Sequence, residues 1–394
     1  MLKFLHTADL HLGKLFHDQN LEEDQKFMLR ALAGILSDPS YKALIIAGDV
    51  YDRSIPSPGA MDLFGSFLGD VKARNPNLIV MVIPGNHDSP LRLGYGRELF
   101  SPMGVKINSN PDDCCNPVIV GEGDEGCAFF LLPFLNPGSF MGKDGAPIHS
   151  QEKLAVLAAK KLEDARLECK KKGINHSVLL AHLFASGGKE SESERIFLGN
   201  AEQVNMGIFS GFDYAALGHL HRYQKAGKNG WYSGSPLAYS FGEAGTDKVF
   251  LSVELGEAGP KVTPVPIEPL RKVSRLEGAF DWLQGEALHD PEIQKIKNDY
   301  LEINLTDKEI KVNAMAFLKS NYPYILNINQ KTAFDSVKRG NNEAFEAALP
   351  SGERRDTAGD FAVFLEELYG GTDEQKLSLF KELLAEAEAA EIKA

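Results

Sequence analysis

The chain has 394 residues, of which 43% are hydrophobic and 25% are charged, and its formal net charge at pH 7 is −13. This length predicts two or three domains, and the composition is that of a globular protein, which excludes disordered and fibrous classes. The negative charge argues against binding of nucleic acid by bulk electrostatics alone. Its four cysteines have no Cys-x-x-Cys spacing, so we expect structural thiols in a cytoplasmic protein; they are Cys114, Cys115, Cys127 and Cys169.

Residues 1–265 alternate short apolar runs with longer amphipathic segments. We expect buried strands over residues 3–6, 43–48, 78–83, 128–132, 177–181 and 214–218. Helices are expected over residues 21–37, 58–72 and 151–171, the second with Ser57 as N-cap and Pro58 in its first turn. The alternation predicts an α/β core with crossover connections, which we assign to a first domain over residues 1–265.

The remaining chain predicts a small second α/β domain and a helical C-terminus. The second domain covers residues 267–345, with strands over 270–276, 300–305 and 324–328 and helices over 278–284 and 313–320. A third region, residues 357–394, contains two amphipathic helices over 361–368 and 372–391. Its apolar stripe favours docking to a partner protein, and packing on the body of the chain is the alternative.

Five short motifs follow the predicted strands in a fixed order. They are Asp9-Leu10-His11, Gly48-Asp49-Val50-Tyr51-Asp52, Gly85-Asn86-His87-Asp88, His182 between Ala181 and Leu183, and Gly218-His219-Leu220-His221. Each motif alone is more often a turn or a hydrogen-bonded core histidine than a ligand. Together they place polar donors at the carboxyl ends of strands, where open α/β sheets bind ligands. The joint pattern therefore predicts one site.

The donors in these motifs are carboxylates, imidazoles and one amide, with no thiolate. This mixture suits manganese, iron or zinc, and two such ions can clamp both oxygens of an in-line displacement at phosphorus. We expect Asp49 to bridge two divalent ions, because a carboxylate has two oxygens. The predicted ligands are Asp9, His11 and His221 for one ion and Asn86, His182 and His219 for the other.

Other polar residues near the motifs have expected roles in catalysis or substrate binding. His87 follows a predicted ligand, so we expect it to stabilise phosphate oxygens or protonate the leaving oxygen. Asp52 is the favoured group to orient His87, as carboxylates commonly orient imidazoles, whereas Asp88 is expected in a turn or N-cap. Candidate substrate-binding residues, which could equally be solvated surface charges, are Arg53, Arg271 and Lys272.

The motifs resemble those of the calcineurin-like metallophosphoesterase superfamily, and over nearly the whole length the chain resembles the SbcD family, the nuclease subunits of bacterial SbcCD exonucleases. The more specific matches are residues 48–54, 85–90, 218–222 and 232–241. The resemblance implies a four-layer αββα sandwich, a small capping domain and C-terminal helices that bind an SbcC-type coiled-coil ATPase. It also implies two manganese ions and two activities on DNA ends and hairpins, a 3′–5′ exonuclease and a single-strand endonuclease. The implied assembly is a homodimer within a heterotetramer, with no association with a membrane.

Two other functions remain open from the residues alone. The motifs define a metal site and not a leaving group, so a small-molecule phosphatase or phosphodiesterase of the same superfamily is the first alternative. A non-catalytic scaffold is the second, although a scaffold has no reason to retain the full ligand set and His87.

Overall fold

A computed structural model describes residues 1–122, 126–142, 145–189, 203–330, 359, 361 and 374–391. The chain divides into two compact units, residues 1–331 and residues 332–394. Among the described residues, none of the helices combines the length and the apolar character needed to cross a membrane.

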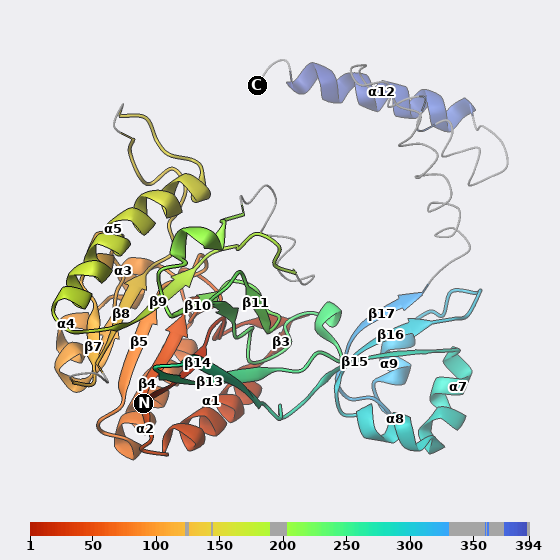
Figure 1. The fold of residues 1–394 in the computed structure, drawn as a ribbon. Coiled ribbons are helices and arrows are strands. Elements are labelled where there is room, and N and C mark those ends of the chain that lie inside the picture. The colour runs from red at the N-terminus through yellow and green to blue at the C-terminus, as the bar shows by residue number, and fades with distance from the viewer. Residues whose placement is uncertain are drawn as a thin grey trace. The chain divides into compact units, whose positions relative to one another are not determined.

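The first unit is built around two six-stranded sheets (Figure 1). In spatial order, the first sheet contains β14 (Gly259–Pro266), β13 (Val249–Gly256), β1 (Leu2–Thr7), β4 (Tyr41–Ala47), β5 (Ile79–Ile83) and β6 (Val105–Ile107). The second contains β11 (Gln224–Ala226), β12 (Gly230–Tyr232), β10 (Tyr214–Gly218), β9 (His176–His182), β8 (Cys127–Leu132) and β7 (Val118–Val120). Strands β1, β4, β5 and β6 are parallel, as are β8, β9, β10 and β12.

Helices cover the outer face of each sheet. The long ones are α1 (Glu22–Leu36) and α2 (Pro58–Arg74) on the first sheet and α5 (Gln151–Lys171) on the second. Short elements are α3 (Pro90–Leu93), α4 (Arg97–Phe100) and the hairpin β2 (Leu15–Phe16) and β3 (Gln19–Asn20). As expected, Ser57 caps α2, accepting a hydrogen bond from the backbone N–H of Ala60.

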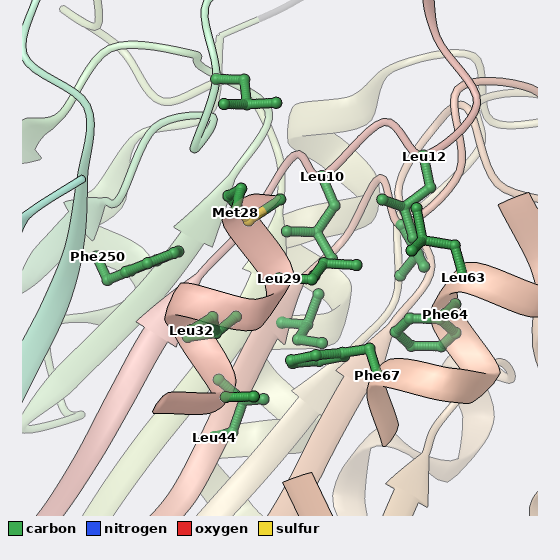
Figure 2. Close-up of a cluster of buried hydrophobic side chains, with 14 of the residues drawn as sticks. Leu10, Leu12, Met28, Leu29, Leu32, Leu44, Leu63, Phe64, Phe67 and Phe250 are labelled. Carbon is green, nitrogen blue, oxygen red and sulfur yellow. The ribbon is translucent and has the colours of Figure 1, made fainter. Parts of the chain in front are cut away.

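Alternate side chains of each central strand enter different cores, because successive residues of a strand point to opposite faces. In β4, Leu44 and Ile46 pack beneath α1 and α2, whereas Ala43 and Ile45 pack between the two sheets. Figure 2 shows the first of these cores, where Leu44 lies with leucines of α1 and with phenylalanines of α2. The layers are therefore helix, sheet, sheet and helix, which confirms the predicted fold class.

The carboxyl ends of the parallel strands bring the sequence motifs together. Asp9 follows β1, Asp49 follows β4 and Asn86 follows β5, while His182 ends β9 and His219 follows β10. Since the two sheets pack face to face, these ends lie along one edge of the sandwich, where the metal site was expected.

Three strands of the first sheet, β6, β13 and β14, were not predicted. Strands β13 and β14 form a hairpin in which β13 pairs antiparallel with β1. Three prolines, at 260, 264 and 266, lie in β14. Proline cannot donate to a neighbouring strand, so it is tolerated here because β14 is an edge strand.

Residues 267–330, which we call the small-sheet region, form a three-stranded parallel sheet with short helices. Its strands are β15 (Val273–Gly278), β16 (Tyr300–Leu305) and β17 (Ile325–Gln330), and its helices are α7 (Phe280–Gln284), α8 (Pro291–Ile296) and α9 (Ala314–Leu318). Helix α8 was not predicted. The expected boundary at residue 345 lies outside the described residues.

The second compact unit contains α12 (Glu374–Glu391). Within this unit the rings of Phe361 and Phe380 stack with their centroids 4.0 Å apart. Most of the other C-terminal helix expected from the sequence, over residues 361–368, lies outside the described residues.

Candidate metal centre

The loops that carry the expected ligands have unusual backbone conformations. Asp9, His11, Asp49 and His219 all have positive φ angles, of 54°, 43°, 49° and 110°. Such angles are uncommon for residues with a side chain, and they cluster at functional sites because the surrounding fold must stabilise them. The strain therefore marks the edge of the sandwich to which the motifs point.

Glycines before the ligands allow close approach of the loops. A Cβ atom at Gly48, whose φ is 96°, would collide with the His182 ring. At Gly218 it would collide with the backbone carbonyl of Ala47. These glycines let the ends of β4, β9 and β10 meet, as the sequence led us to expect.

Asp49 lies at the centre of the site. Its Oδ2 atom is 3.4 Å from Nε2 of His182 and 3.8 Å from Nε2 of His11. Its Oδ1 atom accepts a hydrogen bond of 2.9 Å from the backbone N–H of His87. A carboxylate between two imidazoles is suitably placed to bridge two cations.

Two groups of donors lie on either side of Asp49. In the first, the Nε2 atoms of His11 and His221 are 3.2 Å apart. In the second, Oδ1 of Asn86 lies 2.9 Å from Nε2 of His182 and 3.0 Å from Nδ1 of His219. Each group therefore brings together the donors that we expected to share an ion.

Asp9 lies between the two groups rather than wholly with the first. Its carboxylate accepts the backbone N–H of His219 at 3.0 and 3.1 Å, and Oδ1 is 3.9 Å from Nδ1 of His182. The ligand atoms of Asp9, Asp49 and His182 lie within 4.8 Å of one another, and so do those of His11, Asp49 and His87. His87 is thus near enough to the centre to bind a metal, although the sequence led us to expect a different role.

Asp52 contacts His87 through its main chain. The Nδ1–H of His87 donates to the backbone carbonyl of Asp52 at 2.9 Å. The Asp52 carboxylate instead lies 3.3 Å from Nδ1 of His11 and 2.7 Å from Nζ of Lys14. The expected orienting role of Asp52 toward His87 is therefore corrected: the peptide carbonyl orients His87, and the carboxylate faces a predicted ligand.

Asp88 is a buried brace rather than the turn or N-cap residue that we expected. Its carboxylate accepts backbone N–H groups of Val50, Tyr51 and Gly85 at 2.9 to 3.0 Å. These bonds join the loop that carries Asp49 to the loop that carries Asn86.

Burial shifts the pKa values of the expected ligands strongly. It lowers the pKa of His11 to about 4 and the pKa of His219 to about 3, so both rings are neutral near pH 7. Burial also opposes the charges of Asp49 and His182, but their mutual attraction holds the pKa of Asp49 well below its usual range and raises the pKa of His182 to about 9. Burial raises the pKa of Asp9 to about 7. Because metals bind neutral imidazoles and ionised carboxylates, a divalent ion would displace the His182 proton, and the donor types fit a pair of such ions.

The expected substrate-binding residues have different surroundings. Arg53 is exposed at the rim of the site, with Nε 3.8 Å from the Asp52 carboxylate. Lys272 is also exposed, with Nζ 4.0 Å from Glu268. Arg271 instead binds Glu23 and Asp24 of α1, at 2.5 and 2.8 Å, and joins the small-sheet region to that helix.

Three further residues of the site were not predicted from the sequence: Lys14, Tyr239 and Glu243. Tyr239 donates from its hydroxyl to the backbone carbonyl of Leu10 at 2.5 Å, and its ring packs against His11. The only signal near these residues is the family resemblance of the stretch 232–241, which ends just before Glu243. Glu243 lies 3.6 Å from Nδ1 of His221.

The part of the chain that carries this site matches a known protein family. A model of the calcineurin-like phosphoesterase family matches residues 2–223, more than half of the chain. The chain is similar to the crystal structure of TT1561 of Thermus thermophilus, with 12% identity, coverage of 67% of this chain and 98% of that one, and a TM-score of 0.39. A β-glucosidase, BglU from Micrococcus antarcticus, has 11% identity, 83% coverage of each chain and a TM-score of 0.20.

These TM-scores are too low to support an argument, so the assignment rests on the family model and the residues that it covers. Six of the seven expected ligands and His87 precede His221, which itself lies inside the matched residues. The chain therefore belongs to the calcineurin-like phosphoesterase family, whose members hydrolyse phosphoesters at a centre of two metal ions.

Proposed function

We propose that this chain is a DNA nuclease subunit of the SbcD type, which hydrolyses phosphodiester bonds at DNA ends and hairpins. The observation that carries the hydrolytic part is the convergence of imidazole, amide and carboxylate donors on either side of Asp49. Manganese is the proposed metal, since this donor set suits it.

The bound ions would supply Lewis acidity and would lower the pKa of a water molecule, which makes that water a better nucleophile toward phosphorus. The chain's own residues position the other groups. His87 has its Nδ1–H fixed on the Asp52 carbonyl, so Nε2 is the atom that faces the substrate; when the ring carries its second proton there, Nε2 donates it to the leaving oxygen or hydrogen-bonds a phosphate oxygen. Arg53 at the rim is suited to a neighbouring phosphate.

The part of the chain beyond the family match supports a macromolecular substrate. After residue 223 the chain continues with the small-sheet region and a separate C-terminal unit. A small-molecule phosphatase has less use for these additions than a nuclease that works with other proteins. We propose that the C-terminal helices bind an SbcC-type coiled-coil ATPase, and that two copies of this chain act in a heterotetramer, which would supply the basic surface that an acidic chain lacks.

A small-molecule phosphoesterase is the second candidate. Two observations favour it: the net charge of −13, and the engagement of Arg271 by two carboxylates of α1. Both reduce the positive charge that this chain alone can offer to a DNA backbone.

The test is hydrolysis by the purified full chain with manganese, with zinc and with chelator. The substrates are end-labelled duplex and hairpin DNA, bis-p-nitrophenyl phosphate and p-nitrophenyl phosphate, each assayed with and without the ATPase and ATP. We expect manganese-dependent DNA cleavage that Asp49→Ala abolishes. Asp38→Ala is the matched control, because Asp38 is an exposed aspartate outside the motifs.

Each outcome selects one function. Hydrolysis of the monoester without DNA cleavage would replace the nuclease proposal with the small-molecule alternative. If no substrate is hydrolysed even with the ATPase present, the non-catalytic scaffold becomes the remaining function. Full activity of Asp49→Ala would show that the reaction occurs elsewhere in the protein.

A further inference from the structure

His221 has a carboxylate behind it. Its Nε2 atom faces Nε2 of His11 at 3.2 Å, and its Nδ1 atom lies 3.6 Å from Oε1 of Glu243. Glu243 ends a short 3-10 helix, Phe241–Glu243, and only 1% of its surface is exposed. A buried carboxylate on that side of the ring favours a proton on Nδ1 and leaves the Nε2 lone pair directed into the centre.

The direction of the Glu243 carboxylate is itself fixed. Oε2 accepts from Nζ of Lys248 at 2.5 Å, and Oε1 accepts from the Ser240 hydroxyl at 3.0 Å. Lys248 is anchored in turn, since Nζ also donates to the backbone carbonyl of His221 at 3.1 Å and to the Ser235 hydroxyl at 3.0 Å. The lysine, the carboxylate and the imidazole therefore form one connected chain of polar groups.

The same order of groups is found behind His11. Lys14 binds Asp52 at 2.7 Å, and the Asp52 carboxylate lies 3.3 Å from Nδ1 of His11. Each imidazole of the first group thus has, beside its Nδ1 atom, a carboxylate that a lysine holds in place. His182 of the second group differs, because its Nδ1 atom donates to the backbone carbonyl of Ala47 at 2.9 Å.

We propose that Glu243 is a positioning residue for the metal ligand His221, and that Glu243 and Asp52 together make the His11–His221 position the tighter of the two metal positions. A carboxylate behind an imidazole makes the ring more basic and fixes its orientation, and its loss commonly weakens metal binding by about 10–100-fold. A neutral peptide carbonyl behind His182 provides less of this support. The proposal rests on the metal centre of the proposed function, but not on the substrate being DNA.

The experiment is calorimetric titration of the metal-free full chain with manganese, with metal content measured after desalting. The variant Glu243→Gln removes the charge while keeping the shape of the side chain. We expect wild type to bind two ions with different affinities, and the variant to bind the tighter ion about 10–100-fold more weakly. The affinity for the second ion should change by less than about threefold.

Two further variants separate positioning from folding. Glu302→Gln makes the same change at a carboxylate that is 8% exposed, in the small-sheet region, and should leave both affinities unchanged. Glu243→Gln combined with Lys248→Met avoids a lysine buried without its partner, and should show the same selective loss. Thermal unfolding in chelator monitors the fold of each variant.

The outcomes distinguish this proposal from the proposed function. If the two ions weaken equally, or if neither weakens in a folded Glu243 variant, Glu243 does not position His221. If Glu243→Gln selectively weakens the looser ion, the order of affinities is the reverse of the one proposed. If wild type binds no metal, the centre itself is wrong; if it binds metal as expected but cleaves no DNA, only the substrate of the proposed function fails.

Discussion

The brace formed by Asp88 permits a sharp test of how the site is held together. This buried carboxylate accepts three backbone N–H groups from two loops, those of Val50 and Tyr51 on one and Gly85 on the other. The variant Asp88→Asn keeps the size of the side chain. However, an amide has one acceptor oxygen, so its NH2 group must face at least one of the three N–H groups.

The cost follows from these contacts. Burial and the nearby Asp49 raise the pKa of Asp88 to about 7, so the test is made at about pH 8.5, where the carboxylate is charged. Leaving one buried N–H without an acceptor costs about 1–3 kcal/mol, and replacing the charged acceptor by a neutral one weakens the two remaining bonds by about 0.5–1 kcal/mol each. We therefore expect Asp88→Asn to lower the free energy of unfolding by about 2–5 kcal/mol. Because the brace joins the loops of Asp49 and Asn86, manganese affinity should fall as well.

Urea unfolding of the metal-free chain measures the first effect and calorimetric titration the second. Asp38→Asn is the control, because Asp38 is exposed and accepts from Ser40 and Lys3 at the surface; it should cost less than about 1 kcal/mol. A loss of under about 0.5 kcal/mol in a well-folded Asp88→Asn protein would refute the reasoning, because three bonds to a buried carboxylate cannot all be replaced by one amide.

Three other predictions concern the core, the small-sheet region and the chemistry. Burial lowers the pKa of His6 from 6.5 to about 3, so the unfolded chain binds more protons than the folded chain between these pH values. The free energy of unfolding should therefore fall as pH falls below about 6.5, by up to about 1.4 kcal/mol per pH unit. Urea unfolding at several pH values should show a weaker pH dependence for His6→Gln. Arg271→Ala should destabilise the first unit by about 2–4 kcal/mol, since among the described residues it leaves the side chain of the buried Asp24 with the Tyr300 hydroxyl as its one partner. An effect no larger than that of Lys272→Ala in the same unfolding assay would contradict this. His87→Leu should bind manganese almost normally and turn over about 10²–10⁴-fold more slowly, whereas loss of one ion in a titration would make His87 a ligand.

The sequence predicted the position of the site because position along the chain and position in the sheet are linked. A ligand that directly follows a buried parallel strand must lie at the carboxyl edge of the sheet. Asp9, Asp49 and Asn86 could therefore be placed without coordinates, and the structure brings them together with His182. The α/β core was predictable because its central strands and long helices have clear apolar periodicity, whereas the four-layer arrangement was implied only by the family resemblance.

What the sequence could not predict depends on contacts made far along the chain. The hairpin of β13 and β14 contains three prolines, so its sequence predicts irregular structure. It forms nevertheless because β13 pairs with β1. The role of Asp52 depends on whether its backbone carbonyl or its carboxylate faces His87. The dihedral angles of the loop decide this, and they cannot be read from the sequence. Arg271 looked available for substrate because nothing near it in the sequence indicates the carboxylates of α1.

The buried charges of the site also separate two kinds of carboxylate that the net charge cannot distinguish. Asp52 and Glu243 are each paired with a lysine, at 2.7 and 2.5 Å, so their charge is balanced within the protein. Asp49 is buried too, but within the described residues its ion pairs are made with imidazoles. His11 is neutral near pH 7, whereas Asp49 raises the pKa of His182 to about 9, so His182 balances the charge of Asp49 in the metal-free site. A buried carboxylate requires a compensating cation, and a divalent ion that displaced the His182 proton would take over that role. A lysine cannot be replaced in this way, so lysine-paired carboxylates have the charge balance of positioning groups, and the imidazole-paired Asp49 has that of a metal ligand.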